Sequence, residues 1–81
     1  MQLLLYTHGY PSGRCLLLAQ ELNRSAVMSP SDSIQLAERL FDNQFDEATP
    51  AVIETTDSTA TERIIQICQE MGITAVQATP P

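Results

Sequence analysis

The two cysteines carry the most reactive side chains of this chain, and their positions decide what they could do. Cys15 falls in the first turn of a helix predicted over residues 14–23, beside Arg14, and both a helix N-terminus and a nearby cation lower the pKa of a thiol. Its place on the same apolar stripe as Leu18 instead favours an inward position. Cys68 lies in the middle of the stripe of a later helix. No C-x-x-C pair is formed, so the pattern favours reduced thiols in a cytoplasmic protein, with catalysis through Cys15 as an alternative.

The single histidine, His8, offers a second kind of chemistry. Thr7-His8-Gly9 directly follows an apolar strand, an arrangement that resembles the mannose-type enzyme IIA of the sugar phosphotransferase system, whose histidine after the first strand carries phosphate. An exposed imidazole can act as a nucleophile, and Asp57 in Thr56-Asp57-Ser58 is the predicted orienting partner. The resemblance therefore implies a phosphocarrier as one hypothesis for function.

Three short polar segments are candidate ligand contacts. They are Tyr10-Pro11-Ser12-Gly13, Thr49-Pro50 and Asp57-Ser58. The first is a turn signal, the second precedes an apolar strand and the third can cap a helix. The chain has no lysine and therefore no P-loop, and its single histidine and two cysteines make no zinc pattern, so no metal is expected.

The elements that must position these residues alternate between strands and helices. Apolar runs predict strands at 2–6 and 51–53, with weaker candidates at 25–28 and 72–76. Apolar residues at helical spacing predict helices at 14–23, 33–44 and 60–71, with Ser12 as the first N-cap and Gly72 as the residue that ends the last helix. The carboxylates of Glu38, Asp42, Asp46 and Glu47, on the second helix and directly after it, are mostly expected to face solvent.

This order indicates an α/β domain with helices packed on a small sheet. The continuous apolar run over residues 2–6 is typical of a strand covered on both faces, which places helices on both sides of the sheet. If the strands are parallel, as in a flavodoxin-like βαβαβα alternative, the loops at 7–13, 29–32 and 55–59 meet at one edge, where ligands of such domains bind.

Size and charge exclude some classes of partner. The chain has 81 residues, a net charge of −6 and four basic side chains, all arginine. One domain over residues 1–78 with a frayed tail at 79–81 is expected. Binding to nucleic acid or to an anionic membrane needs clustered cations, so neither is predicted, and no segment is long enough to span a bilayer.

The chain resembles glutaredoxin-like members of the thioredoxin superfamily. The resemblance is carried by Leu5-Tyr6-Thr7 at the end of the first strand, by Pro11 before the first helix and by Thr49-Pro50 before a later strand. It covers roughly residues 1–70 and implies a thioredoxin-like fold whose Thr-Pro peptide bond is cis. In that family the backbone beside the cis-proline pairs with glutathione or an extended peptide. In the related glutathione-transferase domain, an acidic and a hydroxyl residue at the start of the last helix hold the γ-glutamyl end of the ligand, and Thr61-Glu62 or Asp57-Ser58 lie near that place here.

The departure from that family concerns its chemistry. Tyr10-Pro11-Ser12-Gly13 stands where the family has Cys-Pro-x-Cys, so both redox thiols are absent while the proline is kept. The sequence therefore leans away from an enzyme and predicts a redox-inactive binding or adaptor module. Tyr10, Pro11, Ser12, Gly13, Thr49 and Pro50 would grip a peptide, a partner protein or glutathione, and a homodimer stays an open alternative.

Overall fold

The computed structural model describes residues 2–24 and 28–78 and has three helices and three strands in those ranges. In chain order they are β1 (Gln2–Tyr6), α1 (Cys15–Arg24), α2 (Pro30–Phe41), β2 (Ala51–Glu54), α3 (Ser58–Met71) and β3 (Thr74–Ala78). Each helix follows an apolar stripe of helical period. The strand expected at 25–28 lies, except for Met28, outside the described residues, as does the tail at 79–81.

The three strands form an antiparallel sheet in the order β2-β1-β3. Leu4 of β1 lies opposite Val52 of β2 on one side and opposite Val76 of β3 on the other. Because α3 connects β2 to β3 while β1 lies between them, β2–α3–β3 is a split βαβ unit. The parallel flavodoxin-like alternative is wrong, since β1 pairs with both neighbours in the antiparallel sense.

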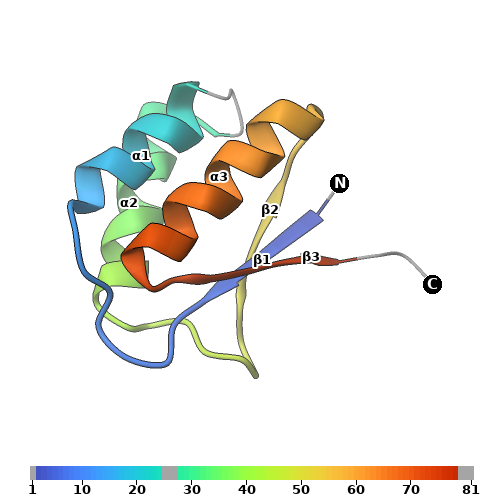
Figure 1. Ribbon diagram of the computed structural model, residues 1–81. Helices are drawn as coiled ribbons and strands as arrows, with labels where there is room; N and C mark the ends of the chain where they lie inside the picture. The colour runs from blue at the N-terminus through green and yellow to red at the C-terminus, as the bar shows by residue number, and fades with distance from the viewer. Residues whose placement is uncertain (1, 25–27, 79–81) are drawn as a thin grey trace.

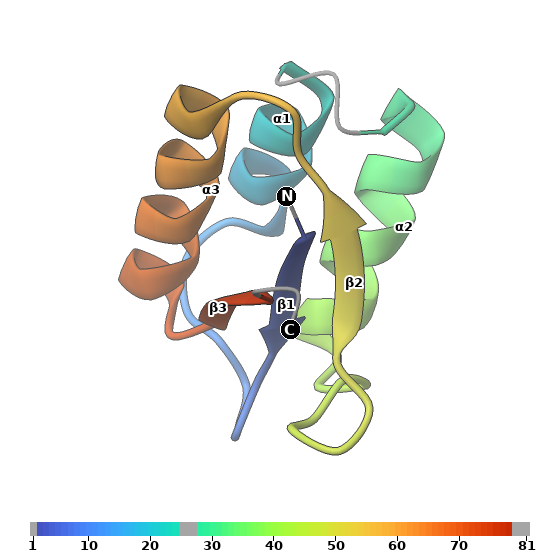
Figure 2. The ribbon, with the colours of Figure 1, turned by 90° about the vertical axis from the view of Figure 1, so that its right-hand side faces the viewer.

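All three helices pack on one face of the sheet. Figures 1 and 2 show α1, α2 and α3 together on one side, with the strands in front of them in the second view. Along β1 the burial alternates: Leu3 and Leu5 are fully buried under the helices, whereas Leu4 between them is only half-buried. The prediction of helices on both faces, with β1 covered twice, is therefore wrong.

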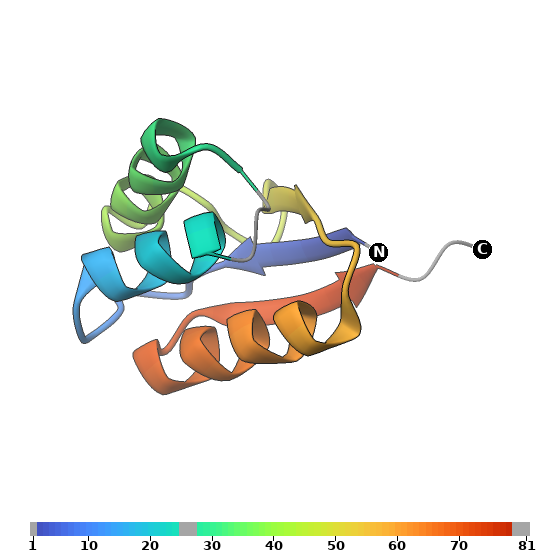
Figure 3. The same cartoon turned by 90° about the horizontal axis from the view of Figure 1, so that it is seen from above.

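The core lies between this sheet and the helices. Figure 3 shows α1 over the sheet between α2 and α3. The stripe predicted for α1 is confirmed, because Leu18, Ala19 and Leu22 are buried. Its neighbours Leu16 and Leu17 remain 57% and 49% exposed, because no further layer covers α1. The wider apolar arc of this helix is thus a surface feature.

Local signals explain where the helices begin and end. The Ser29 hydroxyl accepts the Asp32 N–H (3.2 Å), and Pro30 takes the first helical position, so α2 begins earlier than residue 33. Gly72 has φ 81° and ends α3, as predicted, because glycine tolerates the left-handed conformation. Ser12 does not cap α1, which begins only at Cys15. The strand expected at 72–76 runs from Thr74 to Ala78.

Candidate functional site

The loop after β1 and the loop before β2 are joined at one end of the sheet. The Thr7 N–H donates to the Phe45 carbonyl oxygen (3.1 Å), and the Thr7 hydroxyl contacts the same oxygen (3.3 Å) and Asn43 Oδ1. Thr7 is 2% exposed, and Asn43 has φ 59°, a left-handed conformation that asparagine tolerates. This clamp brings residues 7–13 and 42–50 together, although they are far apart in the sequence.

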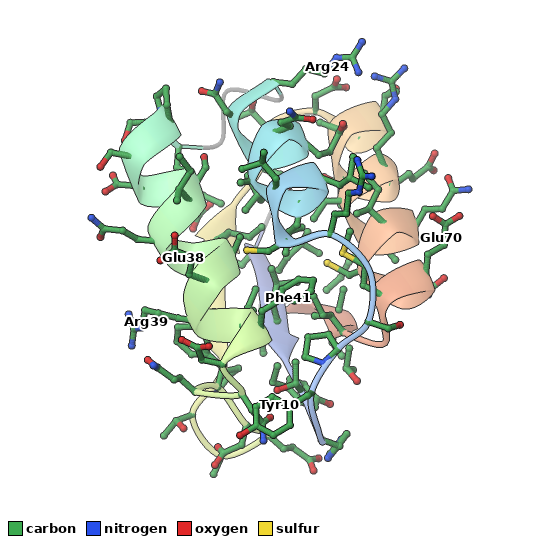
Figure 4. All side chains as sticks on the ribbon, turned by 90° about the vertical axis from the view of Figure 1, so that its left-hand side faces the viewer. Tyr10, Arg24, Glu38, Arg39, Phe41 and Glu70 are labelled. Carbon is green, nitrogen blue, oxygen red and sulfur yellow. The ribbon has the colours of Figure 1, made fainter. Side chains whose placement is uncertain are left out.

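The segment of residues 7–13, here called the Tyr10 loop, is also tied to the end of α3. The Ser12 N–H donates to the Met71 carbonyl oxygen (2.9 Å). Gly13 has φ 101°, and a Cβ at this position would lie 3.4 Å from Met71 Cγ. The backbone therefore turns here in a conformation that disfavours any side chain. Tyr10, at the turn, is 80% exposed and lies at this end of the molecule (Figure 4).

Thr49-Pro50 lies at this end as well, because Ala51 pairs with Leu5 of β1. The Thr49 N–H and hydroxyl both donate to Asp46 Oδ1 (2.8 Å each), and these hydrogen bonds lower the pKa of Asp46. No peptide bond of the described residues is cis, so the cis-proline implied by the glutaredoxin resemblance is absent at Pro50. Here the proline precedes an edge strand, where a missing N–H costs no sheet hydrogen bond.

Asp57-Ser58 lies at the opposite end of β2. Glu54, the last residue of β2, pairs with Gln2 at the start of β1, and the chain turns away there into α3. The Asp57 carboxylate accepts the Thr59 N–H (3.2 Å) and caps α3. The structure thus brings Thr49-Pro50 close to the Tyr10 loop but separates both from Asp57-Ser58. The reason is that β1 and β2 are antiparallel, so their C-terminal ends lie at opposite ends of the sheet.

The same register separates the two residues of the phosphocarrier hypothesis. His8 follows the end of β1, whereas Asp57 follows the end of β2, so the expected pair does not form. His8 is exposed and packs edge-on against Tyr6, with ring centroids 5.4 Å apart. Its neighbour in the structure is therefore an aromatic ring.

The structure places both thiols in surroundings that disfavour the thiolate form. Burial raises the pKa of Cys15, and the carboxylates of Glu38 and Asp42 on the side of α2 raise it further. These causes oppose the lowering that the helix N-terminus and Arg14 would give, and the part played by burial agrees with the inward position that the apolar stripe favours. Burial raises the pKa of Cys68 to about 12, in keeping with its predicted place in the core.

The uncovered face of the sheet is the feature that sequence reasoning missed. Its side chains alternate with the buried ones, and we call them the open face: Gln2, Leu4, Tyr6, Val52, Glu54, Thr74, Val76 and Ala78. Across its middle run Val52, Leu4 and Val76, here called the apolar row, with Val52 57% and Val76 43% exposed. No signal in the sequence distinguishes this row from a buried one. A strand with a continuous apolar run has the same sequence pattern whether helices cover one face of the sheet or both.

Polar and aromatic side chains border the apolar row. At one end the Gln2 side-chain amide donates to Glu54 Oε1 (3.0 Å). At the other end Tyr6 lies on the same face as Leu4 and contacts His8. The open face therefore has an apolar centre, one acidic corner and one aromatic end, which adjoins the Tyr10 loop.

Grooves formed by described residues run along both sides of α1. One, of about 150 Å³, lies against α2 between Leu16, Ala19 and Ile34, and the other, of about 300 Å³, lies against α3 and includes Leu17, Ile67 and Met71. Arg24 and Glu70, both seen in Figure 4, line the second groove, so charges of both signs border it.

Comparisons with protein-family models, curated proteins and solved structures give no match to this chain. No described helix is long and apolar enough to cross a membrane. Across residues 2–24 and 28–78, no three His, Cys, Asp or Glu side chains are grouped so that they could hold a metal ion.

Proposed function

We propose that this chain is a protein-binding module that contacts its partner through the open face of the sheet. The observation that carries the proposal is the apolar row of Val52, Leu4 and Val76, which lies in register across all three strands. Antiparallel sheets that face water usually carry polar residues on that side. A contiguous apolar patch with a polar border is typical of an interaction site.

The surroundings of the two candidate catalytic residues favour binding over catalysis. A thiol nucleophile needs a depressed pKa, whereas burial and two carboxylates raise that of Cys15. A phosphate-carrying histidine benefits from an orienting acid, and the antiparallel register places Asp57 at the other end of the sheet from His8. Neither arrangement offers the activation that its chemistry requires.

The Tyr10 loop and Thr49-Pro50 extend the proposed surface. Tyr6 belongs to the open face and contacts His8, two residues before Tyr10. A partner bound to the apolar row would thus have the aromatic side chain of Tyr6 and the exposed Tyr10 loop next to it. The proposal keeps the adaptor role predicted from the sequence but does not depend on kinship with glutaredoxins. Glutathione stays an alternative ligand of the Tyr10 loop and Thr49-Pro50. A titration with glutathione distinguishes it from a protein partner.

Differential capture from an extract of the source cells tests this function. The bait is the intact chain, compared with Val52→Asp and with the matched control Leu16→Asp, whose wild-type side chain has the same 57% exposure on the helical side. We expect the wild type and Leu16→Asp to retain the same proteins and Val52→Asp to lose them, because an Asp carboxylate in an apolar contact costs several kcal/mol.

Equal retention by all three baits contradicts the proposal, as does loss with Leu16→Asp alone. A titration of the isotope-labelled chain with glutathione accompanies the capture. Amide shifts confined to residues 10–13 and Thr49 would assign the surface to a small ligand and refute a protein partner. Circular dichroism of both variants checks that each retains the wild-type fold.

A further inference from the structure

We propose that a partner protein adds one extended segment as a fourth strand along the edge of β3. The segment has apolar side chains at alternate positions. This contact lies at the edge of the sheet and not on the open face, so it goes beyond the function proposed above and each can fail without the other. Three observations support it: the composition of β3, the incomplete cover of its helical side and the position of α3.

β3 is an edge strand without the features that usually prevent pairing. In the described part of the chain its backbone pairs with β1 alone. Because an antiparallel neighbour bonds only alternate residues, the other N–H and C=O groups of β3 point away from β1. Its residues, Thr74–Ala78, include no charge and no proline, two means by which edge strands are kept from pairing. The other edge strand, β2, follows Pro50 and ends with Glu54.

The helices cover β2 completely on their side of the sheet but cover β3 only in part. On the helical side of β2, Ala51 and Ile53 are buried. Ala75 and Gln77 lie on the same side of β3, because they pair with the two buried leucines of β1. Ala75 is only half-buried, however, and Gln77 is exposed. The helical side of the sheet is therefore incompletely covered at β3, the edge that also lacks charge and proline.

One side of α3 offers an apolar contact to an added strand. Residues two apart on a helix project in directions about 200° apart, and Ile67 lines the groove against α1, so Ile65 lies on the side of α3 away from α1. Ile65 is half-buried. Figures 2 and 3 show α3 outside β3, at this margin of the sheet. A strand added to β3 therefore lies beneath α3, where its apolar side chains contact Ile65 and Ala75 while its backbone bonds to β3.

A second copy of the chain fits this edge poorly. Two β3 strands would pair antiparallel about a two-fold axis perpendicular to the sheet, and both α3 helices would then lie on the same side of it. Paired strands are about 4.8 Å apart, whereas packed helices need about 8–10 Å between their axes. Because α3 already lies outside β3, the two α3 helices would overlap. An extended segment brings no helix with it and therefore fits where a second copy does not.

A synthetic peptide provides the direct test. The probe is a neutral peptide of about nine residues in which valine alternates with threonine, with a lysine at one end and a glutamate at the other. The control peptide has the same side chains, but its backbone amides are N-methylated and cannot donate. We expect the probe to shift the amide signals of β3 in the intact chain and to slow hydrogen exchange at alternate residues of β3, because only those residues point away from β1. The methylated peptide should do neither.

Four variants assign the site. Ile65→Thr should weaken binding of the probe about fivefold, because apolar surface above the added strand is lost. Ile67→Thr, the same change at a half-buried position on the other side of α3, should leave binding unchanged. Gln77→Lys places a charge under the added strand and should weaken binding in the same direction as Ile65→Thr. Because Gln77 is exposed, this variant keeps the assignment testable if Ile65→Thr disturbs the core. Val52→Asp, on the distant strand β2, should leave binding of the probe unchanged.

Each other outcome overturns the added strand. Failure of the probe to bind at about 1 mM refutes it, as does equal binding of the methylated peptide. Shifts confined to β2 place the probe at the other edge and contradict the assignment to β3. If Val52→Asp abolishes binding of the probe, the probe lies on the open face, and only the edge contact is refuted while the protein-binding function stands. If sedimentation shows dimers that the probe dissociates, the occupant of the edge is a second copy.

Discussion

Replacing Thr7 by valine tests the clamp that joins the Tyr10 loop to the loop before β2. Valine has nearly the shape of threonine but lacks the hydroxyl group. The Thr7 N–H keeps its bond to the Phe45 carbonyl oxygen (3.1 Å), so this acceptor retains a donor. Asn43 Oδ1 loses the hydroxyl of Thr7. The substitution thus removes both contacts of the hydroxyl group, to Asn43 Oδ1 and to the Phe45 carbonyl oxygen, and leaves the surrounding packing in place.

The exposure of the partners sets the size of the effect. A buried acceptor left without a donor costs about 1–3 kcal/mol, but Asn43 is exposed and water can take the place of the hydroxyl. We therefore expect the free energy of unfolding to fall by about 1 kcal/mol, at the lower end of that range. In a domain of this size the melting temperature should fall by roughly 4–8 °C.

Urea and thermal unfolding, followed by circular dichroism, measure this loss. A double-mutant cycle with Asn43→Gly assigns it, because glycine suits φ 59° and removes the side-chain amide. In the Asn43→Gly background Thr7→Val should cost less than half as much. Thr74→Val, the same change at a half-buried strand position, should stay within about 0.5 kcal/mol of the wild type. Equal costs of Thr7→Val in both backgrounds would refute the clamp.

Three further predictions concern the thiols and the end of α3. Cys15 should be alkylated more slowly than an unfolded thiol at pH 8, because its pKa is raised, and equal rates would contradict this. The pKa of Cys68 is raised to about 12 from 9.0, so the unfolded state ionises first. The free energy of unfolding should therefore fall by about 1.4 kcal/mol per unit between pH 9 and 12 because of Cys68, and Cys68→Ala should remove that part of the slope and leave the part due to Cys15. Gly72→Ala should destabilise the chain by about 1 kcal/mol because of φ 81°, whereas Gly9→Ala, with open space around it, should not. Chemical unfolding measures both glycine variants, and equal effects would refute the argument.

The glutaredoxin resemblance illustrates how short motifs can mislead about a site. Pro11 and Thr49-Pro50 do reach the same end of the sheet, as that resemblance implied. The peptide bond before Pro50 is trans, however, and Asp57-Ser58 lies at the other end of β2. These relationships depend on strand order and direction, which a motif of two or three residues does not encode.

The charge around Cys15 is a second case in which distant residues decide. The helix N-terminus and Arg14 are neighbours in the sequence, and both favour a thiolate. Glu38 and Asp42 come from more than twenty residues further along the chain and favour the neutral thiol, as does burial. Only the packing of α2 beside α1 brings these carboxylates close enough to matter.

Local sequence patterns are sufficient to predict most of the helices and strands of this protein. The apolar spacing of Leu18, Ala19 and Leu22 predicts the buried side of α1, the stripe around Cys68 predicts that of α3, and Gly72 marks where α3 ends. These features follow from side-chain periodicity and backbone conformation, which act over a few residues.

Which sides of the strands are buried, and against which neighbour each element packs, depend on contacts between distant parts of the chain. The run at 2–6 reads the same whether one helical layer or two will bury it, and strand order arises from contacts between residues far apart in the chain. Because all three helices pack on the same face, Val52, Leu4 and Val76 remain at the surface. The candidate binding surface therefore exists because of an arrangement of layers that local sequence patterns do not specify.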